Sequence, residues 1–221
     1  MAAVRSLFAE YLGTALIVST VLGAGHMVAL LEASPALGLI IIAVGVGSVL
    51  FGAISALGPI SGAHFNPVVS LAFLLRKDLS LGKLFGYFVA QVVGAISGAV
   101  MANLMFEKSA LTVSSVDRLG SGIFLGEVIA TFGLVLTILL LVGSQPQLIP
   151  AAVALWIVAG HVFISSTSFA NPAVTLGRMF SDAPSSISPA SLPGYLVAQV
   201  LGLALALLVS NFLIRKKADH D

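Results

Sequence analysis

The sequence contains no cysteine and few charged side chains. Of its 221 residues only 9% are charged, ten Lys or Arg and nine Asp or Glu. The absence of Cys excludes disulfides, thiolate metal sites and a cysteine nucleophile, and it leaves the redox compartment undetermined. A soluble domain typically carries about 25% charged residues. The nineteen charged side chains of this chain could not cover the surface of a soluble fold of its size. The net charge of +1 gives no basic face for nucleic acid.

Apolar residues make up 58% of the chain, and the mean hydropathy is +1.11. A helix needs about 20 mostly apolar residues to cross the hydrocarbon core of a bilayer. Six segments meet this requirement: roughly residues 7–31, 36–57, 84–106, 122–142, 148–165 and 192–213. We therefore predict an all-α membrane protein with six transmembrane helices, forming a single domain over residues 1–221.

Two further apolar stretches, residues 66–75 and 171–180, are too short to span the membrane. Each begins with Asn-Pro. Asn is a favourable helix N-cap, and Pro is favourable at the first helical position. The sequence therefore predicts two re-entrant half-helices that lie inside the membrane.

The two halves of the chain carry the same motifs in the same order. Glu10 and Thr14 recur as Glu127 and Thr131, the segment GYFVAQVVG at 86–94 recurs as GYLVAQVLG at 194–202, and Asn66-Pro67-Val68 recurs as Asn171-Pro172-Ala173. We expect repeats over roughly residues 5–110 and 120–214. Since each repeat has three spans, an odd number, the second copy must be inverted. Inverted repeats with broken helices form sites near the bilayer midplane, where irregular backbone is tolerated if it lines a watery cavity.

The positive charges are unevenly distributed between the two sides of the predicted membrane domain. Six spans place both termini on one side, which then carries seven cations: Arg5, Arg76, Lys77, Lys83, Arg215, Lys216 and Lys217. The other side carries Lys108, Arg118 and Arg178. By the positive-inside rule, we expect a multi-pass protein of the cell inner (plasma) membrane with both termini in the cytoplasm.

The paired motifs resemble those of the aquaporin, or major intrinsic protein, family. The segments at 61–69 and 168–174 look like its two Asn-Pro-Ala motifs, with Asn66, Pro67 and Val68 in the first and Asn171, Pro172 and Ala173 in the second. The Glu-x-x-x-Thr pairs and the glutamines Gln91 and Gln199 resemble further family positions. The similarity extends over roughly residues 5–214 in the family's order. It implies six tilted helices, a pore in each protomer and a homotetramer.

The resemblance implies that Asn66 and Asn171 face the pore where the two half-helices meet. The helix dipoles place partial positive charge there. A water that accepts N–H bonds from both side chains could not relay protons, and positive half-helix ends can exclude protons. The alternative is that both residues are only N-caps. The two roles are compatible, because the carboxamide oxygen can cap the helix while the NH₂ group faces the pore.

Glu10 and Glu127 lie inside predicted spans, where a carboxylate is costly and usually functional. One interpretation is a proton relay, which would suit a transporter. The other is that each acid accepts hydrogen bonds from backbone N–H groups of a re-entrant loop, assisted by Gln91 and Gln199. We favour the bracing interpretation, because both halves carry the same acid.

The predicted selectivity filter departs from the family pattern. In most members an Arg directly follows the second Asn-Pro-Ala motif, whereas Val174 stands here. Counted from the motifs, the other filter positions are Val46, Ala159 and Ser168; a loop shortened by two residues would put His161 in place of Ala159. These side chains predict an opening that is wider and less polar than a water filter.

Two other side chains are candidates for the pore mouths. Arg178 lies four residues after Val174 and so shares its helix face. It either guards the outer mouth or is a surface Arg that pairs with Asp182 or extends to lipid head groups; we favour the surface interpretation. The resemblance places His64 on the cytoplasmic pore wall, and the alternative is a packed loop histidine.

We predict a passive channel for water and small uncharged solutes, such as glycerol and other polyols, urea-like solutes or neutral metalloid hydroxides, which excludes protons and ions. An Asn-Pro-Ala motif followed by Val also resembles a bacterial subgroup linked to arsenical permeation. The alternatives are a water-selective aquaporin, an ion-coupled secondary transporter and a structural or adhesion role with a closed pore. No enzyme, cofactor or metal site is expected, because no nucleophile–base pair or ligand-spaced cluster occurs. Small solutes and membrane lipid are the expected partners, and nucleic acid is not.

Overall fold

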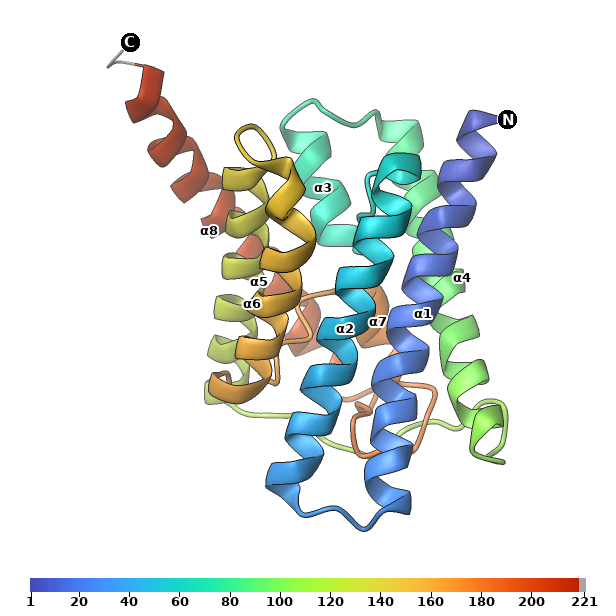
Figure 1. Ribbon diagram of the computed structural model, residues 1–221. Coiled ribbons are helices and arrows are strands. Elements are labelled where there is room, and N and C mark those ends of the chain that lie inside the picture. The colour runs from blue at the N-terminus through green and yellow to red at the C-terminus, as the bar shows by residue number, and fades with distance from the viewer. Residues whose placement is uncertain (219–221) are drawn as a thin grey trace.

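The structure is a computed structural model that describes the backbone of residues 1–218 and the side chains of residues 1–214. Every regular element within this part of the chain is helical (Figure 1). The elements are α1 (Ala2–Leu30), α2 (Pro35–Ser61), α3 (Pro67–Leu75), α4 (Leu81–Met105), α5 (Ser121–Leu141), the 3₁₀ turn η1 (Pro146–Leu148), α6 (Ile149–Phe163), α7 (Pro172–Arg178) and α8 (Leu192–Ala218). Three of the cations counted above, Arg215, Lys216 and Lys217, lie outside the described side chains.

The six predicted spans are confirmed: six helices of the described chain are long and apolar enough to cross a membrane. Several helices extend beyond their apolar runs. Thus α1 begins at Ala2 rather than at residue 7, and its first turns are exposed and include Arg5. The half-helix α7 is shorter than predicted and ends at Arg178 rather than at residue 180, because Met179 and Phe180 already turn into the following loop.

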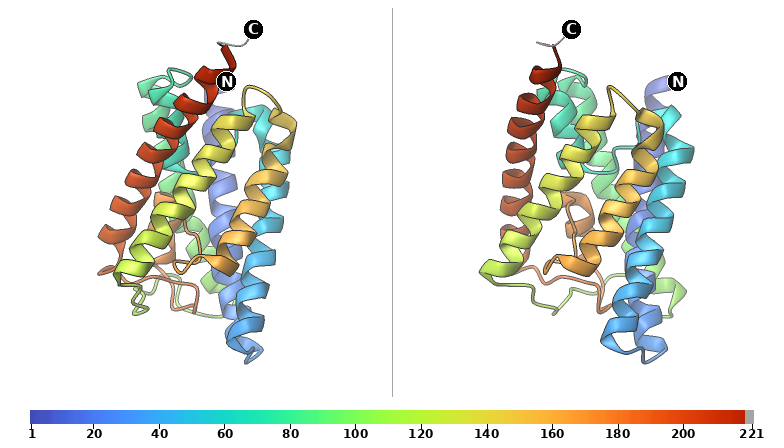
Figure 2. Two further views of the ribbon diagram at one scale, coloured as in Figure 1. Left: turned by 90° about the vertical axis from the view of Figure 1, so that its left-hand side faces the viewer. Right: turned by 60° about the vertical axis from the view of Figure 1, so that its left-hand side comes forward.

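The two halves of the chain run through the molecule in opposite directions. The N-terminus and the far end of α8 lie at the same end of the molecule in every view (Figures 1 and 2). The short helix α3 lies in the half that carries these ends, whereas α7 begins near the middle (Figure 1). The first residues of α3 and α7 are close together, because side chains from each loop bond to the other. This is the arrangement expected of an inverted repeat with two half-helices.

Close helix packing explains the recurring glycines of the repeat. A Cβ atom at Gly94 of α4 would overlap the carbonyl group of Tyr11 in α1, and one at Gly98 would overlap that of Ala15. In the second half, a Cβ at Gly202 of α8 would lie 2.6 Å from the carbonyl oxygen of Val128 in α5. Small residues at these crossings allow the helix backbones to approach each other. The pairs α1–α4 and α5–α8 therefore form equivalent close contacts that support the interior.

The loops that lead into the half-helices share an unusual backbone conformation. Phe65 and Ala170, each directly before the Asn of its motif, have φ values of 48–49°, and Ala63 and Ser168, two residues earlier, have φ values of 51–52°. Non-glycine residues in this left-handed region cost of order 1 kcal/mol or more each. The repeated strain implies that the surrounding structure holds both loops in place.

Candidate functional site

The asparagines of the two motifs cap their own half-helices. The Oδ1 atom of Asn66 accepts the backbone N–H of Val68 at 3.0 Å. The Oδ1 atom of Asn171 accepts the N–H groups of Ala173 at 3.0 Å and Val174 at 3.2 Å. These bonds use the carboxamide oxygen and leave the NH₂ group of each side chain for other contacts.

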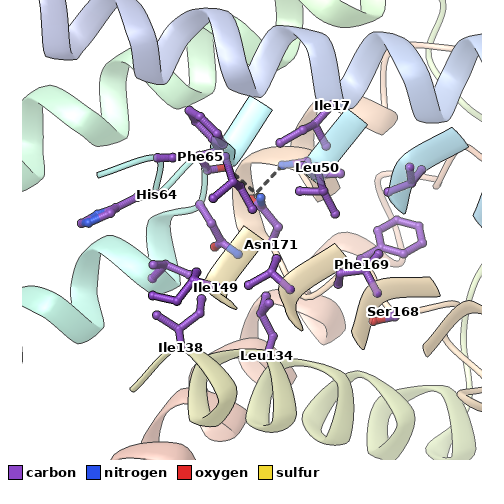
Figure 3. Close-up of a pocket in the computed structure, with 18 of the residues that line it drawn as sticks. Ile17, Leu50, His64, Phe65, Leu134, Ile138, Ile149, Ser168, Phe169 and Asn171 are labelled. Carbon is purple, nitrogen blue, oxygen red and sulfur yellow. Dashed lines mark hydrogen bonds between the residues drawn. The ribbon is translucent and has the colours of Figure 1, made fainter. Parts of the chain in front are cut away.

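Each asparagine also bonds to the opposite loop. The Nδ2 atom of Asn66 donates to the carbonyl oxygen of Ala170 at 2.7 Å. That of Asn171 donates to the carbonyl oxygen of Phe65 at 2.8 Å (Figure 3). An amide NH₂ group has two donors, so one N–H of each side chain remains available. Both residues line the central cavity.

Glu10 holds the first re-entrant loop from inside α1. One carboxylate oxygen accepts the Ser61 hydroxyl at 2.7 Å and the backbone N–H of His64 at 2.9 Å. The other accepts the backbone N–H of Phe65 at 2.6 Å and the side-chain amide of Gln91 at 2.8 Å. The carboxylate is fully buried, and four donors compensate its loss of water. This is the arrangement expected of a brace for the strained loop.

Glu127 makes the equivalent contacts in the second half. Its carboxylate accepts the backbone N–H groups of Phe169, at 3.2 Å, and of Ala170. The amide of Gln199 donates to it at 2.8 Å. Because each acid grips the two residues that precede the motif Asn, both hold the left-handed residue whose carbonyl receives the cross-loop bond. The two braces and the two cross-loop bonds therefore form one symmetric network.

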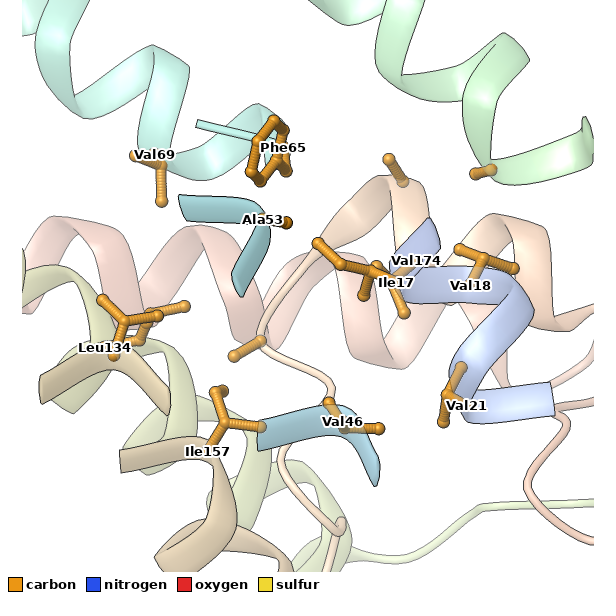
Figure 4. Packing of buried hydrophobic residues seen from close by; sticks show 14 of the residues in the cluster. Ile17, Val18, Val21, Val46, Ala53, Phe65, Val69, Leu134, Ile157 and Val174 are labelled. Carbon is orange, nitrogen blue, oxygen red and sulfur yellow. The ribbon is translucent and has the colours of Figure 1, made fainter. Parts of the chain in front are cut away.

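The central cavity has a volume of about 200 Å³ and passes along this network. Most of its wall is apolar, and Figure 4 shows buried apolar side chains from different helices that pack around this interior, among them Ile17, Val46, Leu134, Ile157 and Val174. The polar lining residues are few: His64, Asn66, His161, Ser168, Asn171 and Arg178. In Figure 3, His64 lies at one end of the cavity, Ser168 at the other and Asn171 between them.

A second, more open hollow of about 570 Å³ lies at the end of the cavity away from the chain termini. We call it the distal vestibule, and its lining includes Glu32, Arg118, His161, Arg178 and Ser185. His161 and Arg178 line both the cavity and the vestibule. These two residues therefore mark the neck between the two spaces.

The filter position on α6 requires a correction. Ala159 is exposed on the outside of the helix and does not line the cavity, whereas His161 is buried and does. Two residues along a helix turn the side chain by about 200°, so only one of them can face the interior. The structure therefore contradicts Ala159 as a lining residue and places the alternative, His161, on the cavity wall.

His161 and Ser168 present polar atoms to the neck. The Nδ1 atom of His161 lies 2.8 Å from the carbonyl oxygen of Ile157, which can only accept, so Nδ1 carries the proton and Nε2 presents a lone pair. Neither Nε2 of His161 nor the hydroxyl of Ser168 has a partner among the described residues, although both are buried. Val46 and Val174, both 5% exposed, line the cavity too, so these polar atoms and the guanidinium of Arg178 lie beside aliphatic walls.

The surface interpretation of Arg178 is wrong. The side chain is only 3% exposed, and its Nε donates to the carbonyl oxygen of Ser185 at 2.6 Å. Its guanidinium carbon lies 3.3 Å from the centroid of the Phe169 ring. Asp182 is exposed, and no ion pair joins it to Arg178 in the described structure. Arg178 is instead a buried cation at the neck.

Arg118 is a site residue that the sequence did not indicate. It lies in the loop between α4 and α5 and donates to the carbonyl oxygens of Ser186 at 2.7 Å and Pro184 at 3.0 Å. Its guanidinium carbon lies 5.3 Å from the centroid of the Phe169 ring. Burial lowers the pKa of the Arg118 guanidinium. In the sequence it was one loop cation among several, and no local pattern ties it to a loop about 70 residues away.

His64 lies at the end of the cavity nearer the termini. Its Nδ1 atom is 3.0 Å from the hydroxyl of Ser70, and its ring centroid is 4.6 Å from that of Phe73 and 5.4 Å from that of Tyr87. The residue is thus packed and at the same time lines the cavity, which combines the two interpretations offered for it. No group of three His, Cys, Asp or Glu among the described residues could hold a metal ion.

Comparisons with known proteins agree with this architecture. A model of the family "Major intrinsic protein" matches residues 1–164. Aquaglyceroporin AqpS of Rhizobium meliloti is 43% identical over 211 residues, which cover 96% of this chain and 91% of that protein. The lens fiber major intrinsic protein of Lithobates pipiens is 29% identical, over 95% of this chain and 81% of that protein. The X-ray structure of the aquaglyceroporin from Plasmodium falciparum has the same fold, with a TM-score of 0.74, 23% identity and coverage of 95% of both chains.

Proposed function

The chain belongs to the major intrinsic protein family, and on that premise we propose which solutes its pore passes and how it excludes ions. The protein is a membrane channel for water and small solutes and not an enzyme. We propose that it passes uncharged solutes larger than water, namely glycerol and other small polyols, and neutral metalloid hydroxides of similar size. Passage is passive and follows the gradient of the solute alone.

The observation that carries this proposal is the composition of the neck and of the cavity wall beside it. Val46 and Val174 supply aliphatic walls, and His161 and Ser168 supply buried polar atoms without protein partners, next to the guanidinium of Arg178. A polyol presents carbon on one side and hydroxyls on the other, so it matches such a lining. Pore diameter and lining donors set selectivity in pores of this kind. The 43% identity to an aquaglyceroporin supports the same conclusion.

Ion and proton exclusion is assigned to the two asparagines. Asn66 and Asn171 each keep one N–H after capping and cross-loop bonding. The half-helix N-termini add partial positive charge at the same place. A water that accepts both N–H groups is oriented so that it cannot pass a proton along the file.

A second candidate is a water-selective pore, and His161 is the observation that favours it. An imidazole at the neck narrows the opening and adds an acceptor that the sequence count had assigned to a small Ala. An ion-coupled transporter is less favoured, because Glu10 and Glu127 are fully engaged in hydrogen bonds to their loops. Glycerol permeability separates the first two functions, and dependence of flux on an ion gradient identifies the third.

We also propose that the protein is a plasma-membrane homotetramer of single-domain protomers, each with its own pore and with both termini in the cytoplasm. The end that carries the termini has Arg5, Arg76, Lys77 and Lys83. Since Arg178 is buried at the neck, it does not count as a loop charge on the other side. The difference in positive charge between the two sides is therefore greater than the count from the sequence indicated. Exposed large apolar side chains, such as Leu155, Phe163 and Leu208, suit contact with lipid or with neighbouring protomers.

The deciding experiment is stopped-flow light scattering on proteoliposomes, with water, glycerol, urea and arsenous acid as the test solutes. We expect glycerol permeability well above that of empty liposomes. Rapid water flux without glycerol or arsenous acid flux would contradict the wide-pore proposal in favour of the water-selective one. No flux of any solute above empty liposomes would point to the structural role with a closed pore.

A further inference from the structure

Two arginines of the distal vestibule converge on one aromatic ring, that of Phe169, which lines the central cavity. The guanidinium carbons of Arg178 and Arg118 lie 3.3 and 5.3 Å from the centroid of Phe169. They come from different parts of the chain, α7 and the loop between α4 and α5, and both line the vestibule. Arg178 also lines the central cavity. The vestibule therefore has two fixed cations at its floor, next to the neck.

Most of the hydrogen-bond donors of the Arg178 guanidinium have no acceptor among the described residues. Its guanidinium has five N–H donors, and the hydrogen bond to the Ser185 carbonyl is the one that it makes within the described chain. The side chain is 3% exposed and has no carboxylate partner there. Buried charges are usually paired, because an uncompensated charge in a low-dielectric site is costly. Stacking on Phe169 contributes a cation–π interaction but satisfies no N–H group.

Few other titratable groups lie near the two arginines. The buried carboxylate of Glu127 interacts with both of them, but it is bonded to its own loop and to Gln199 and does not line the vestibule. The lining of the vestibule contains one carboxylate, that of Glu32, and one imidazole, that of His161. Glu32 is exposed, so water screens its charge, whereas the arginines are buried or half-buried and are screened less. The imidazole has an unpartnered Nε2 atom, which can accept a hydrogen bond from a protonated ligand oxygen.

We propose that the distal vestibule is a binding site for a small oxyanion, held by Arg178 and Arg118, and that its occupancy closes the neck to neutral solutes. Arginine forks match the paired oxygens of carboxylates, phosphates and similar anions. The bound anion lies directly over the path, because Arg178 and His161 line both spaces. It does not pass through, since the mostly apolar wall of the cavity beyond the neck offers no replacement for its hydration shell.

Inorganic phosphate is a suitable probe, because it does not cross lipid bilayers as the neutral solutes do. Titration calorimetry on the purified full-length protein should give saturable phosphate binding in a low-chloride buffer. Arg178→Gln should weaken it by about tenfold or more, the effect typical of losing hydrogen bonds to a charged group. Arg178→Lys keeps the charge but not the forked donor group, so its affinity for phosphate should lie between those of the parent protein and Arg178→Gln. Glu32→Gln should tighten phosphate binding.

Arg76→Gln is the matched control, because Arg76 lies at the opposite end of the molecule in an exposed pair with Asp78. It should leave phosphate binding unchanged. Gel filtration and thermal unfolding establish that each variant is folded before its binding is compared. In proteoliposomes, phosphate should also slow glycerol flux through the parent protein at constant ionic strength.

Absence of saturable binding, or binding that Arg178→Gln and Arg118→Gln leave unchanged, would overturn the inference. Binding that does not slow glycerol flux would overturn its second half, the closure of the neck. The calorimetric result does not depend on the proposed solute selectivity. A protein that binds phosphate but passes no glycerol would thus contradict the proposed function and support the site.

Discussion

The side-chain Nδ2 atom of Asn66 donates a hydrogen bond to the backbone carbonyl oxygen of Ala170 at 2.7 Å, although the two residues are 104 positions apart in the chain. Ala170 is in the left-handed region, with a φ of 48°, and its N–H is bound by Glu127. The bond of Asn66 thus fixes a residue that the second half of the chain already holds under strain. Stability and pore geometry depend here on the same contacts.

Replacement of Asn66 by Ala should destabilise the protein by about 2 kcal/mol. The change removes a helix N-cap, worth about 1 kcal/mol, and a buried hydrogen bond, worth about 1 kcal/mol. Thermal unfolding in detergent measures the loss. Asn66→Asp keeps the capping oxygen but sets a second oxygen against the carbonyl of Ala170, so it should also destabilise the protein. A loss well below about 2 kcal/mol in Asn66→Ala would contradict the role of the cross-loop bond.

Glu127→Gln tests the brace against a proton relay. The amide keeps one oxygen but turns an NH₂ group toward a loop N–H that needs an acceptor. The resulting buried, unsatisfied donor should cost about 1–3 kcal/mol, seen as a lower unfolding midpoint. A relay would instead predict unchanged stability, and flux that depends on a pH gradient in the parent protein but not in the variant.

His161→Ala should widen the neck and raise the permeability to glycerol and to longer polyols several-fold. The imidazole is buried and lines the neck, whereas Ala159 is exposed on the other side of α6. Ala159→Val is therefore the control and should leave permeability unchanged. Stopped-flow measurements on the two variants compare the positions directly, and a response at 159 instead of 161 would refute the geometry of the neck.

The helix crossing at Gly94 predicts a position-specific effect on stability. A methyl group there would overlap the carbonyl of Tyr11, whereas one at Gly82 of the same helix would meet nothing within 4 Å. Gly94→Ala should therefore cost about 1–3 kcal/mol by overpacking, and Gly82→Ala should be neutral or stabilising by up to about 1 kcal/mol through helix propensity. Thermal unfolding of the two variants provides the comparison.

The absence of native Cys allows a direct test of orientation. Single substitutions Lys108→Cys and Lys77→Cys place thiols in loops at opposite ends of the molecule. A membrane-impermeant maleimide added to the side opposite the cytoplasm should label the first and not the second. The reverse pattern would place the termini outside the cytoplasm.

Local pattern was enough to predict the spans and the half-helices. Apolar runs of sufficient length and Asn-Pro starts depend only on neighbours in the chain, so the positions of α3 and α7 followed from Asn66 and Asn171. The equivalence of Glu10 and Glu127 also followed, because a repeated residue in a costly place indicates a repeated role.

The distal end was less predictable, because its contacts join distant segments. Whether Ala159 or His161 faces the neck depends on the path of the loop from Phe163 to Asn171, and a shift of two residues reverses the side of the helix. Arg178 was assigned to the surface, since its partners Phe169 and Ser185 carry no signal for a cation. Arg118 reaches the site only through a loop that folds back over it.

The exchange of hydrogen bonds between the two loops has a consequence for biosynthesis. Asn66 of the first loop donates to the carbonyl oxygen of Ala170 in the second loop. Asn171 of the second loop donates to the carbonyl oxygen of Phe65 in the first. During translation the side-chain N–H donor of Asn66 therefore lacks this acceptor until more than a hundred further residues have been made and inserted. The channel can reach its final form only late in synthesis, and in a chain that is truncated before residue 170 the first loop would be held by Glu10 without the cross-loop bonds.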